Sequence, residues 1–500
     1  MLLTQLRLGR IGGAFALLTA ITAFWITLPL GAQQESFLPG SPIPIPPVLQ
    51  PSRVEGSAVV YELTAAPGSR AFVADAETAT LGYNGDYLGP TIRVDRGQDV
   101  DIRVTNGLSE ATTVHWHGAH LPAEADGGPH QIIPPGDTWT ASFLVDQEAA
   151  TLWYHPHLMG TTAEQVYEGL AGFLIVEDEV SDSLALPREY GVNDIPVVLQ
   201  ERRFGRDGRF RYRPAMPDIM HGYFGNALLT NGVIEPYLEV TRGILRLRLL
   251  NGSNSTILRL SLNNGAPFHQ IAGDGGFLEA PVRLEQIILS PGERAEVLVD
   301  FSAGVAASTR DPRGTRGAPA QLLAETNAGG QYVALEFRRP KRISDSGEIP
   351  DRLRSRNSGL STEGVRRRRF LMSTMGPGGR LTINGKLMDM DRIDEEVTLG
   401  TTEIWDVVND AMGRGMMGPM GNVPHNFHVH GLQFFILSIN GAPPPPELAG
   451  PKDTVLLWPG DRVELVLRFT DYTGIYMYHC HLLEHEDEGM MGQFLVTEAN

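Results

Sequence analysis

Short alternations of apolar and polar residues recur along most of the chain, and alternation with a period of two predicts β-strands. The chain also contains 56 glycines and 35 prolines, and dipeptides such as Asn384-Gly385 and Asn440-Gly441 stand between apolar runs, as in hairpin turns. Residues 475–481, Ile-Tyr-Met-Tyr-His-Cys-His, have the aromatic and β-branched content of a strand. The pattern therefore predicts an all-β fold.

The length of 500 residues suggests about three domains, at ~150 residues for each. The strand-like pattern divides into the stretches 55–180, 185–340 and 370–500. Residues 341–369 are rich in charge and include Arg366 to Arg369, so we expect a solvated linker there.

The N-terminus has the pattern of a targeting segment. Arginines precede an apolar run from Ile11 to Leu30, and the small residues Gly31 and Ala32 follow it. We expect residues 1–32 to be a bacterial-type signal peptide, removed on export to the periplasm or the exterior. A retained membrane anchor is the alternative, because about 20 apolar residues can span a bilayer. The proline-rich residues 33–54 would form an extended linker.

The formal net charge of −18 argues against nucleic acid and against an anionic membrane surface as partners. A single cysteine in an exported protein is typical where the only thiol must stay free to bind a metal. Nothing in the sequence indicates a partner subunit, and we expect a monomer.

The most informative tripeptide is His479-Cys480-His481, because Cys480 is the only cysteine. A lone cysteine forms no internal disulfide, so its role is packing, reactivity or metal binding. With His485 and Met490 downstream, the segment contains most of the ligand set of a blue-copper electron-transfer site, which is two histidines, a thiolate and a weak axial methionine. On a strand, Cys480 faces one way and its two neighbours face the other. Two metal centres would then be joined through very few bonds.

Three further histidine clusters argue against the simpler interpretation, a buried strand cysteine with incidental histidines. Each cluster places two imidazoles on one strand face: His115-Trp116-His117, His155-Pro156-His157, and His428-Val429-His430 with His425 upstream. Ten of the 14 histidines fall in these clusters and in the segment around Cys480. Two clusters lie near the start of the mature chain and two near its end, which predicts a multinuclear site between an N-terminal and a C-terminal domain.

The motifs HWHG, HPH, HNFHVH and HCHLLEHEDEGM together resemble the four copper-binding motifs of the multicopper oxidases, which include laccases, bilirubin oxidases and bacterial copper-efflux oxidases. The resemblance covers the chain from about residue 55 to the end. It implies three cupredoxin-like Greek-key β-sandwich domains, the middle one copper-free and structural. It also implies four copper ions: one type 1, one type 2 and two type 3.

The resemblance assigns each ligand to one copper. The type 1 ligands would be His425, Cys480, His485 and Met490. The type 2 ligands would be His115 and His428. One type 3 copper would be held by His117, His155 and His481, and the other by His157, His430 and His479. Such a protein takes single electrons at the type 1 site and uses four of them at the three-copper cluster to reduce O2 to water.

Oxygen reduction also consumes protons, and two carboxyl groups resemble the proton donors of the family. Asp126 follows the HWHG motif, and Glu486 directly follows His485. A buried carboxyl with a shifted pKa can relay protons. The alternative is a carboxylate that only orients a histidine. We expect Glu484, Asp487 and Glu488 to be solvated or structural.

The substrate is less constrained by the sequence. Four methionines and an aspartate lie just upstream of His425: Asp410, Met412, Met416, Met417 and Met420. Thioethers suit Cu(I), so this segment could collect cuprous ions. Alternatively, it could be an apolar lid that admits phenols and other aromatic reductants. The expected linker 341–369 has arginine and serine where copper-efflux oxidases have methionine, which favours the second interpretation.

Other classes of function stay open at this point. One is a copper-binding or copper-tolerance protein that sequesters the metal without significant turnover. Another is a copper-free scaffold of the same fold, as in the cell-division relatives of the family, but those relatives lack most of the ligands that this chain retains.

Overall fold

The computed structural model describes residues 40–302, 319–338, 343, 347–355, 362–410 and 423–499. The segment 1–32, expected to be a signal peptide, lies outside these residues. Among the described residues, no helix is long and apolar enough to cross a membrane.

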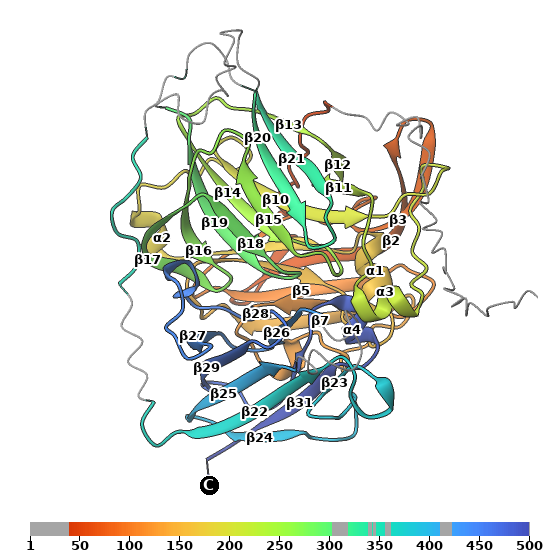
Figure 1. Ribbon diagram of the computed structural model, residues 1–500, viewed down its shortest axis with the longest axis vertical. Helices are drawn as coiled ribbons and strands as arrows, with labels where there is room; N and C mark the ends of the chain where they lie inside the picture. Colours follow the sequence, from red (N-terminus) through yellow and green to blue (C-terminus); the bar gives the residue numbers. More distant parts are fainter. Residues whose placement is uncertain are drawn as a thin grey trace, which may run out of the picture. The chain divides into compact units, whose positions relative to one another are not determined.

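The described chain forms six β-sheets, which fall into three pairs along the sequence. Figure 1 shows that strands make up most of the chain. The first pair is formed by residues 53–177. One of its sheets contains β1 (Arg53–Glu55), β2 (Ala58–Val73), β5 (Asp99–Asn106) and β7 (Thr138–Leu144) in that order, with β3 (Ala76–Tyr83) paired to β2. The other contains, in order, β4 (Ile92–Asp95), β9 (Gly172–Glu177), β8 (Ala150–His155) and β6 (His115–His117).

The middle pair is formed by residues 194–338. Its larger sheet contains, in order, β12 (Val233–Ile234), β11 (Ala227–Thr230), β10 (Asp194–Arg202), β14 (Ile244–Asn251), β19 (Arg294–Asp300), β16 (Phe268–Gly273) and β17 (Gly276–Leu284). Its smaller sheet contains, in order, β13 (Tyr237–Glu239), β21 (Gln331–Arg338), β20 (Ala320–Thr326), β15 (Leu258–Leu262) and β18 (Gln286–Leu289).

The third pair is formed by residues 366–497. One sheet contains, in order, β23 (Thr382–Ile383), β22 (Arg366–Ser373), β25 (Thr402–Asn409), β29 (Arg462–Arg468) and β27 (Phe434–Ile439). The other contains, in order, β24 (Glu395–Thr398), β31 (Met491–Thr497), β30 (Gly474–His479), β26 (His425–Val429) and β28 (Thr454–Leu457).

Helices are short and lie between strands. Among the described residues, the α-helices are α1 (Thr162–Glu168), α2 (Glu179–Ser183), α3 (Met216–His221) and α4 (Leu483–Asp487). The 3-10 helices are η1 (Ala123–Ala125), η2 (Pro377–Gly379) and η4 (Pro446–Leu448). Both α1 and α3 contact α4, so segments from all three sheet pairs meet beside the residues that follow Cys480.

The three sheet pairs repeat one pattern of strand pairing. In each pair the first long strand is parallel to a later one, as β2 is to β5, β10 to β14 and β22 to β25. A hairpin cannot join parallel strands, so the chain crosses to the facing sheet between them. Each pair encloses its own apolar core, with residues from both of its sheets. Ile102 and Leu174 belong to the first core, Leu247 and Leu260 to the middle one, and Trp405 and Phe427 to the third. The all-β prediction is confirmed, while the predicted boundaries of three domains stay a prediction.

Two local predictions need correction. The strand expected over 475–481 ends at His479. The backbone N–H of Cys480 still donates to the carbonyl of Met490 (3.0 Å), but the N–H of Met490 donates to the carbonyl of His485 (2.9 Å), so the pairing with β31 stops there. The linker expected over 341–369 is also too long, since β22 begins at Arg366. In contrast, the Asn440-Gly441 turn is confirmed, with φ of 53° and 80°. These positive φ values are those of a two-residue hairpin turn.

The arginine run at the start of β22 has a structural role. Arg368 is 8% exposed, and its guanidinium is paired with the buried Glu403 at 2.5 Å and also with Glu395. Glu403 accepts a further hydrogen bond from the indole of Trp405 (3.0 Å). Neighbouring Arg367 is about half exposed and pairs with Glu464 at the surface.

We expect Arg368→Ala to lower the free energy of unfolding by about 3–5 kcal/mol, because it leaves the Glu403 carboxylate buried without its cation. The matched change Arg367→Ala removes an exposed pair and should cost less than about 1 kcal/mol. Urea unfolding of both variants measures the difference, and equal losses would contradict a structural role for Arg368.

Candidate metal centre

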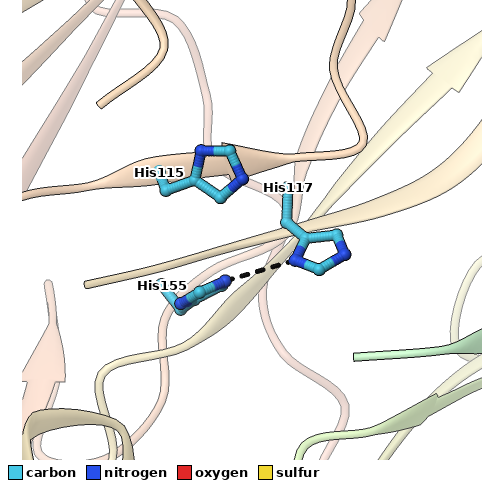
Figure 2. Close-up of side chains that lie close together, drawn as sticks. All are labelled: His115, His117 and His155. Carbon is cyan, nitrogen blue, oxygen red and sulfur yellow. Dashed lines mark hydrogen bonds between the residues drawn. The ribbon is translucent and has the colours of Figure 1, made fainter. Parts of the chain in front are cut away.

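Strands β6 and β8 position the first three histidines. In their antiparallel pairing, His115 lies opposite His155 and Trp116 lies opposite Tyr154. Opposed residues share a face of a sheet, so the histidines leave one face while Trp116 and Tyr154 pack on the other, with ring centroids 5.7 Å apart. Figure 2 shows the rings of His115, His117 and His155 gathered on that face.

The third sheet pair contributes a matching set from β26 and β30, where His428 lies opposite His479. Rings from the two sheet pairs meet in buried groups whose ligand atoms lie within 4.8 Å of one another. These groups are His115–His117–His155, His115–His428–His430 and His157–His430–His479. The histidine clusters from the two ends of the sequence therefore converge on one buried site.

Ring nitrogens of different histidines approach each other closely at this site. The distances are 3.0 Å for His157 Nε2–His479 Nε2, 3.1 Å for His430 Nε2–His479 Nε2, 3.3 Å for His117 Nδ1–His155 Nε2, 3.5 Å for His481 Nε2–His155 Nε2 and 3.5 Å for His115 Nε2–His428 Nε2. All eight rings are at most 1% exposed.

The second nitrogen of most rings faces an oxygen. The backbone carbonyl of Asp126 accepts from His115 Nδ1, and the carbonyl of Asp453 accepts from His428 Nδ1, each at 2.9 Å. The Asp126 carboxylate accepts from His430 Nδ1 at 2.8 Å. An N–H turned outward fixes the tautomer and leaves the other nitrogen's lone pair directed inward, which is the usual support of a metal-binding histidine.

A second buried group lies on the other side of Cys480. The sulfur of Cys480 is 3.6 Å from Nδ1 of both His425 and His485, and these two nitrogens are 3.2 Å apart. Nε2 of His425 hydrogen-bonds the hydroxyl of Thr374 (3.0 Å), which orients its Nδ1 toward the sulfur. Met490 is fully buried in the same core, and its N–H donates to the carbonyl of His485 at 2.9 Å.

The prediction that Cys480 and its neighbours serve two different groups agrees with these contacts. Cys480 approaches His425 and His485, whereas His479 and His481 approach the histidines of the other cluster. The two groups are therefore connected through the backbone of consecutive residues.

The electrostatics favour neutral rings and a bound cation. Burial lowers the pKa of all ten histidines of the two groups, to about 4 for His485 and about 3 for His157 and His481. Burial also raises the pKa of the Cys480 thiol to about 12, so a thiolate there needs a positive charge beside it. Neutral imidazoles with inward lone pairs and one thiol form a donor set that suits copper.

The two predicted proton donors lie against the histidine cluster. Asp126 and Glu486 are 3% and 1% exposed, and burial raises the pKa of each carboxyl well above its usual value. Glu486 lies 3.3 Å from Nδ1 of His157 and 3.2 Å from Nδ1 of His479. Both carboxyl groups are thus placed to hold a proton beside ligand rings.

Neighbouring acids have structural roles. Glu484 is buried and accepts hydrogen bonds from Asn254 (2.9 Å) and Ser255 of the middle sheet pair. Asp487 accepts from backbone N–H groups at the start of α1, including Ala163 at 2.8 Å.

Sequence reasoning missed Asp453 and Arg294. The Asp453 carboxylate lies 3.0 Å from Nε2 of His117, and Arg294 donates to both of its oxygens. Both residues are at most 1% exposed. The available indication was Lys452-Asp453, a charged pair that directly precedes the apolar strand β28, next to a histidine-bearing strand.

The predicted substrate residues are only partly described. Met412, Met416, Met417 and Met420 lie outside the described residues. Asp410 is partly buried, and its N–H donates to the carbonyl of Met372 at 2.8 Å. Asp410 belongs to no metal-compatible group among the residues that are described.

Comparison with known proteins agrees with this chemistry. Residues 65–181 and 359–500 match two domain families that are both described as multicopper oxidase. The multicopper oxidase mco of Staphylococcus epidermidis is 37% identical over 437 residues, which cover 87% of this chain and 88% of that protein. The cell division protein FtsP of Escherichia coli is 38% identical over 473 residues, covering 91% and 93%. A crystal structure of a multi-copper oxidase from Pediococcus acidilactici superposes with a TM-score of 0.82 at 37% identity, covering 92% of each chain.

The chain belongs to the multicopper oxidase family. It is a copper-dependent oxidoreductase that passes electrons from a reducing substrate to O2, and its sheet pairs have the cupredoxin fold of that family.

We expect the metal-free protein to lose stability as the pH falls from about 6.5 toward 4, because histidine in the unfolded chain binds protons below about pH 6.5. The ten buried histidines have lowered pKa values, so over this interval the unfolded chain binds protons that the folded chain does not. Burial raises the pKa of some carboxyl groups, which acts in the opposite sense but concerns fewer groups than the ten histidines; these carboxyl groups are Asp95, Asp126, Glu168, Asp274, Glu484, Glu486 and Asp487. The thermal unfolding midpoint as a function of pH measures the effect, and a flat profile below pH 6.5 would contradict neutral rings.

Proposed function

We propose that the protein is a laccase-type oxidase with four copper ions, which oxidises small phenolic or other aromatic reductants one electron at a time and reduces O2 to two waters. The observation that supports this most is the position of Cys480 between two donor groups, with His425 and His485 on one side and the eight-histidine cluster on the other.

In this proposal the ligand assignment follows the donor groups. His425, Cys480, His485 and Met490 hold the type 1 copper. His115 and His428 hold the type 2 copper. His117, His155 and His481 hold one type 3 copper, and His157, His430 and His479 hold the other. When bound, the coppers supply one-electron transfer at the first site and four-electron transfer to O2 at the cluster.

The protein's own residues orient the ligands, exclude water and provide protons. The carbonyls of Asp126 and Asp453 and the Asp453 carboxylate hold the outward nitrogens of three rings, so the inward lone pairs stay fixed. Trp153, stacked on His155 with ring centroids 4.1 Å apart, closes one side of the cluster to water. The four protons needed for each O2 would pass through the carboxyl groups of Asp126 and Glu486.

A second candidate function is oxidation of Cu(I) in copper tolerance. The sequence feature that favours it is the methionine-rich stretch with Met412, Met416, Met417 and Met420, since thioethers bind Cu(I). We also propose that the protein is exported by residues 1–32 and acts as a monomer in the periplasm or outside the cell.

We expect Cys480→Ser to abolish the blue absorption of the copper-loaded protein and to stop O2 uptake with both 2,6-dimethoxyphenol and Cu(I). A serine hydroxyl is a poor substitute for the thiolate, although it is close in size and leaves the core packed. Absorption spectra and an oxygen electrode give both readouts. Phenol oxidation at the native rate in this variant would refute the assignment of the type 1 site.

We expect Glu486→Gln to slow O2 reduction by about 100-fold, because an amide cannot deliver a proton to the cluster. Anaerobic reduction of the blue centre by substrate should be unchanged, since it precedes the proton-consuming step. Glu488→Gln, on the exposed neighbour just after α4, is the matched control and should behave like the native protein. A normal rate of reoxidation by O2 in Glu486→Gln would leave Glu486 with an orienting role only.

A further inference from the structure

The side chain of Arg202 is fully buried where β10 of the middle sheet pair meets α1. The central carbon of its guanidinium lies 4.6 Å from the ring centroid of Tyr167, and its Nη atoms donate to the backbone carbonyls of Glu201 and Val166, each at 3.0 Å. Its Nε–H, in contrast, has no hydrogen-bond partner among the described residues. Arg202 therefore brings a whole positive charge into the interior and leaves a donor unused there.

Arg202 differs in this respect from the other buried arginines. Four arginines that are at most 8% exposed form ion pairs with buried acids: Arg246 with Glu296, Arg248 with Asp194 (2.7 Å), Arg294 with Asp453 (2.6 Å) and Arg368 with Glu403 (2.5 Å). Arg202 forms no ion pair with any described residue. A buried ion without a counter-charge is costly, and the face of the Tyr167 ring compensates only part of that cost.

The adjacent acid, Glu201, does not supply the missing negative charge. Successive side chains of a strand point to opposite faces, so Glu201 and Arg202 leave β10 in opposite directions. The Glu201 carboxylate accepts from the backbone N–H of Gly225 (2.9 Å) and from the hydroxyls of Tyr332 (3.0 Å) and Thr256. This carboxylate is therefore engaged on the other face of the strand.

A second unused donor lies on the same face of β10 as Arg202. Gln200 is fully buried, and its position two residues before Arg202 sets the two Cα atoms about 7 Å apart. The hydroxyl of Tyr87 donates to Oε1 of Gln200 at 2.9 Å, while Nε2 has no hydrogen-bond partner among the described residues. Burial raises the pKa of the Tyr87 hydroxyl, and the nearby charge of Arg202 opposes that rise. Two unpartnered N–H donors and a cation thus gather around one hydroxyl.

The cavity next to this group is also positive. It has a volume of about 380 Å³, lies beneath residues 44–50 and is lined by Tyr87. Arg70 is the one charged side chain in its lining among the described residues, and Arg70 forms no ion pair with any of them. Its guanidinium lies 5.9 Å from the centroid of the Tyr87 ring. In a chain with a formal net charge of −18, two cations without acids near one ring favour an anionic ligand and give it a route inward.

We propose that Arg202 and Gln200 bind one chloride ion between β10 and α1. The ion accepts hydrogen bonds from Nε of Arg202 and Nε2 of Gln200, and it neutralises the guanidinium. One unpaired guanidinium requires one negative charge, so a monovalent ion fits, whereas a divalent oxyanion would leave a negative charge uncompensated. The role of the ion is structural: it stabilises the contact of β10 with Val166 of α1, the helix whose N–H of Ala163 donates to Asp487.

The first test is a crystal structure of the copper-loaded protein grown with sodium bromide as the only halide salt. Bromide is a close analogue of chloride, and data collected above and below its absorption edge distinguish it from copper. We expect a bromine peak within hydrogen-bond distance of both Arg202 Nε and Gln200 Nε2. A water molecule at this position, without a bromine signal, would overturn the proposal.

The second test is urea unfolding of the copper-free protein at increasing chloride, with the ionic strength kept constant by sodium gluconate, whose anion is too bulky for the site. An ion that binds only the folded chain should lower the unfolding constant about tenfold for each tenfold rise in chloride above its Kd. Arg202→Met retains the length of the side chain and removes its charge, so the unfolding constant should no longer depend on chloride. Arg203→Met, at a neighbouring arginine paired with Asp218 (2.9 Å), is the matched control and should keep the native dependence.

Gln200→Leu keeps the test decisive if Arg202→Met folds poorly. It removes the second donor and leaves the cation, so it should raise the Kd for chloride about tenfold, the effect of losing one hydrogen bond to a charged group. A chloride dependence equal to that of the native protein in either variant would count against the site. Neither test measures oxidase activity, so a negative result would leave the function proposed above intact.

Discussion

The structure depends on the fact that each buried imidazole has two nitrogens with opposite needs. One nitrogen must offer a lone pair toward the centre, so the other must carry the proton and find an oxygen away from water. The carbonyls of Asp126 and Asp453, the carboxylates of Asp126 and Asp453 and the hydroxyl of Thr374 supply those oxygens. Without them, neutral rings whose nitrogens lie 3.0–3.5 Å apart would have no preferred tautomer or orientation.

The middle sheet pair provides none of the twelve proposed ligands, but it does more than separate the outer two. Its Arg294 holds the Asp453 carboxylate in place against His117, and its Asn254 and Ser255 fix Glu484 beside Glu486. Ser290 and Pro291 accept from the Asn426 side chain, which lies next to the Cys480 sulfur. The described residues belong to one compact unit. Residues of all three sheet pairs stabilise the donor groups within it.

Overall sequence identity does not decide what such a chain does. A multicopper oxidase and a cell division protein are similar to this chain at 37% and 38% identity over nearly its full length. In the function proposed for this chain, the residues that matter are few, namely the histidines and the cysteine of the two buried groups and the carboxyl groups around them.

The sequence by itself determined the all-β fold and the identity of the donor residues. Alternating apolar positions and dipeptides such as Asn440-Gly441 are local features that can be recognised in the sequence. A histidine pair at i, i+2, such as His115 and His117, is expected to share one face once the segment is predicted to be a strand. The sequence did not predict where β30 ends or where β22 begins, because those limits depend on backbone pairing with β31 and β25, which lie later in the sequence. Nor did it reveal Asp453 or Arg294. Those features arise from contacts between sheet pairs that are remote in sequence, and only the packing of the folded chain brings their atoms together.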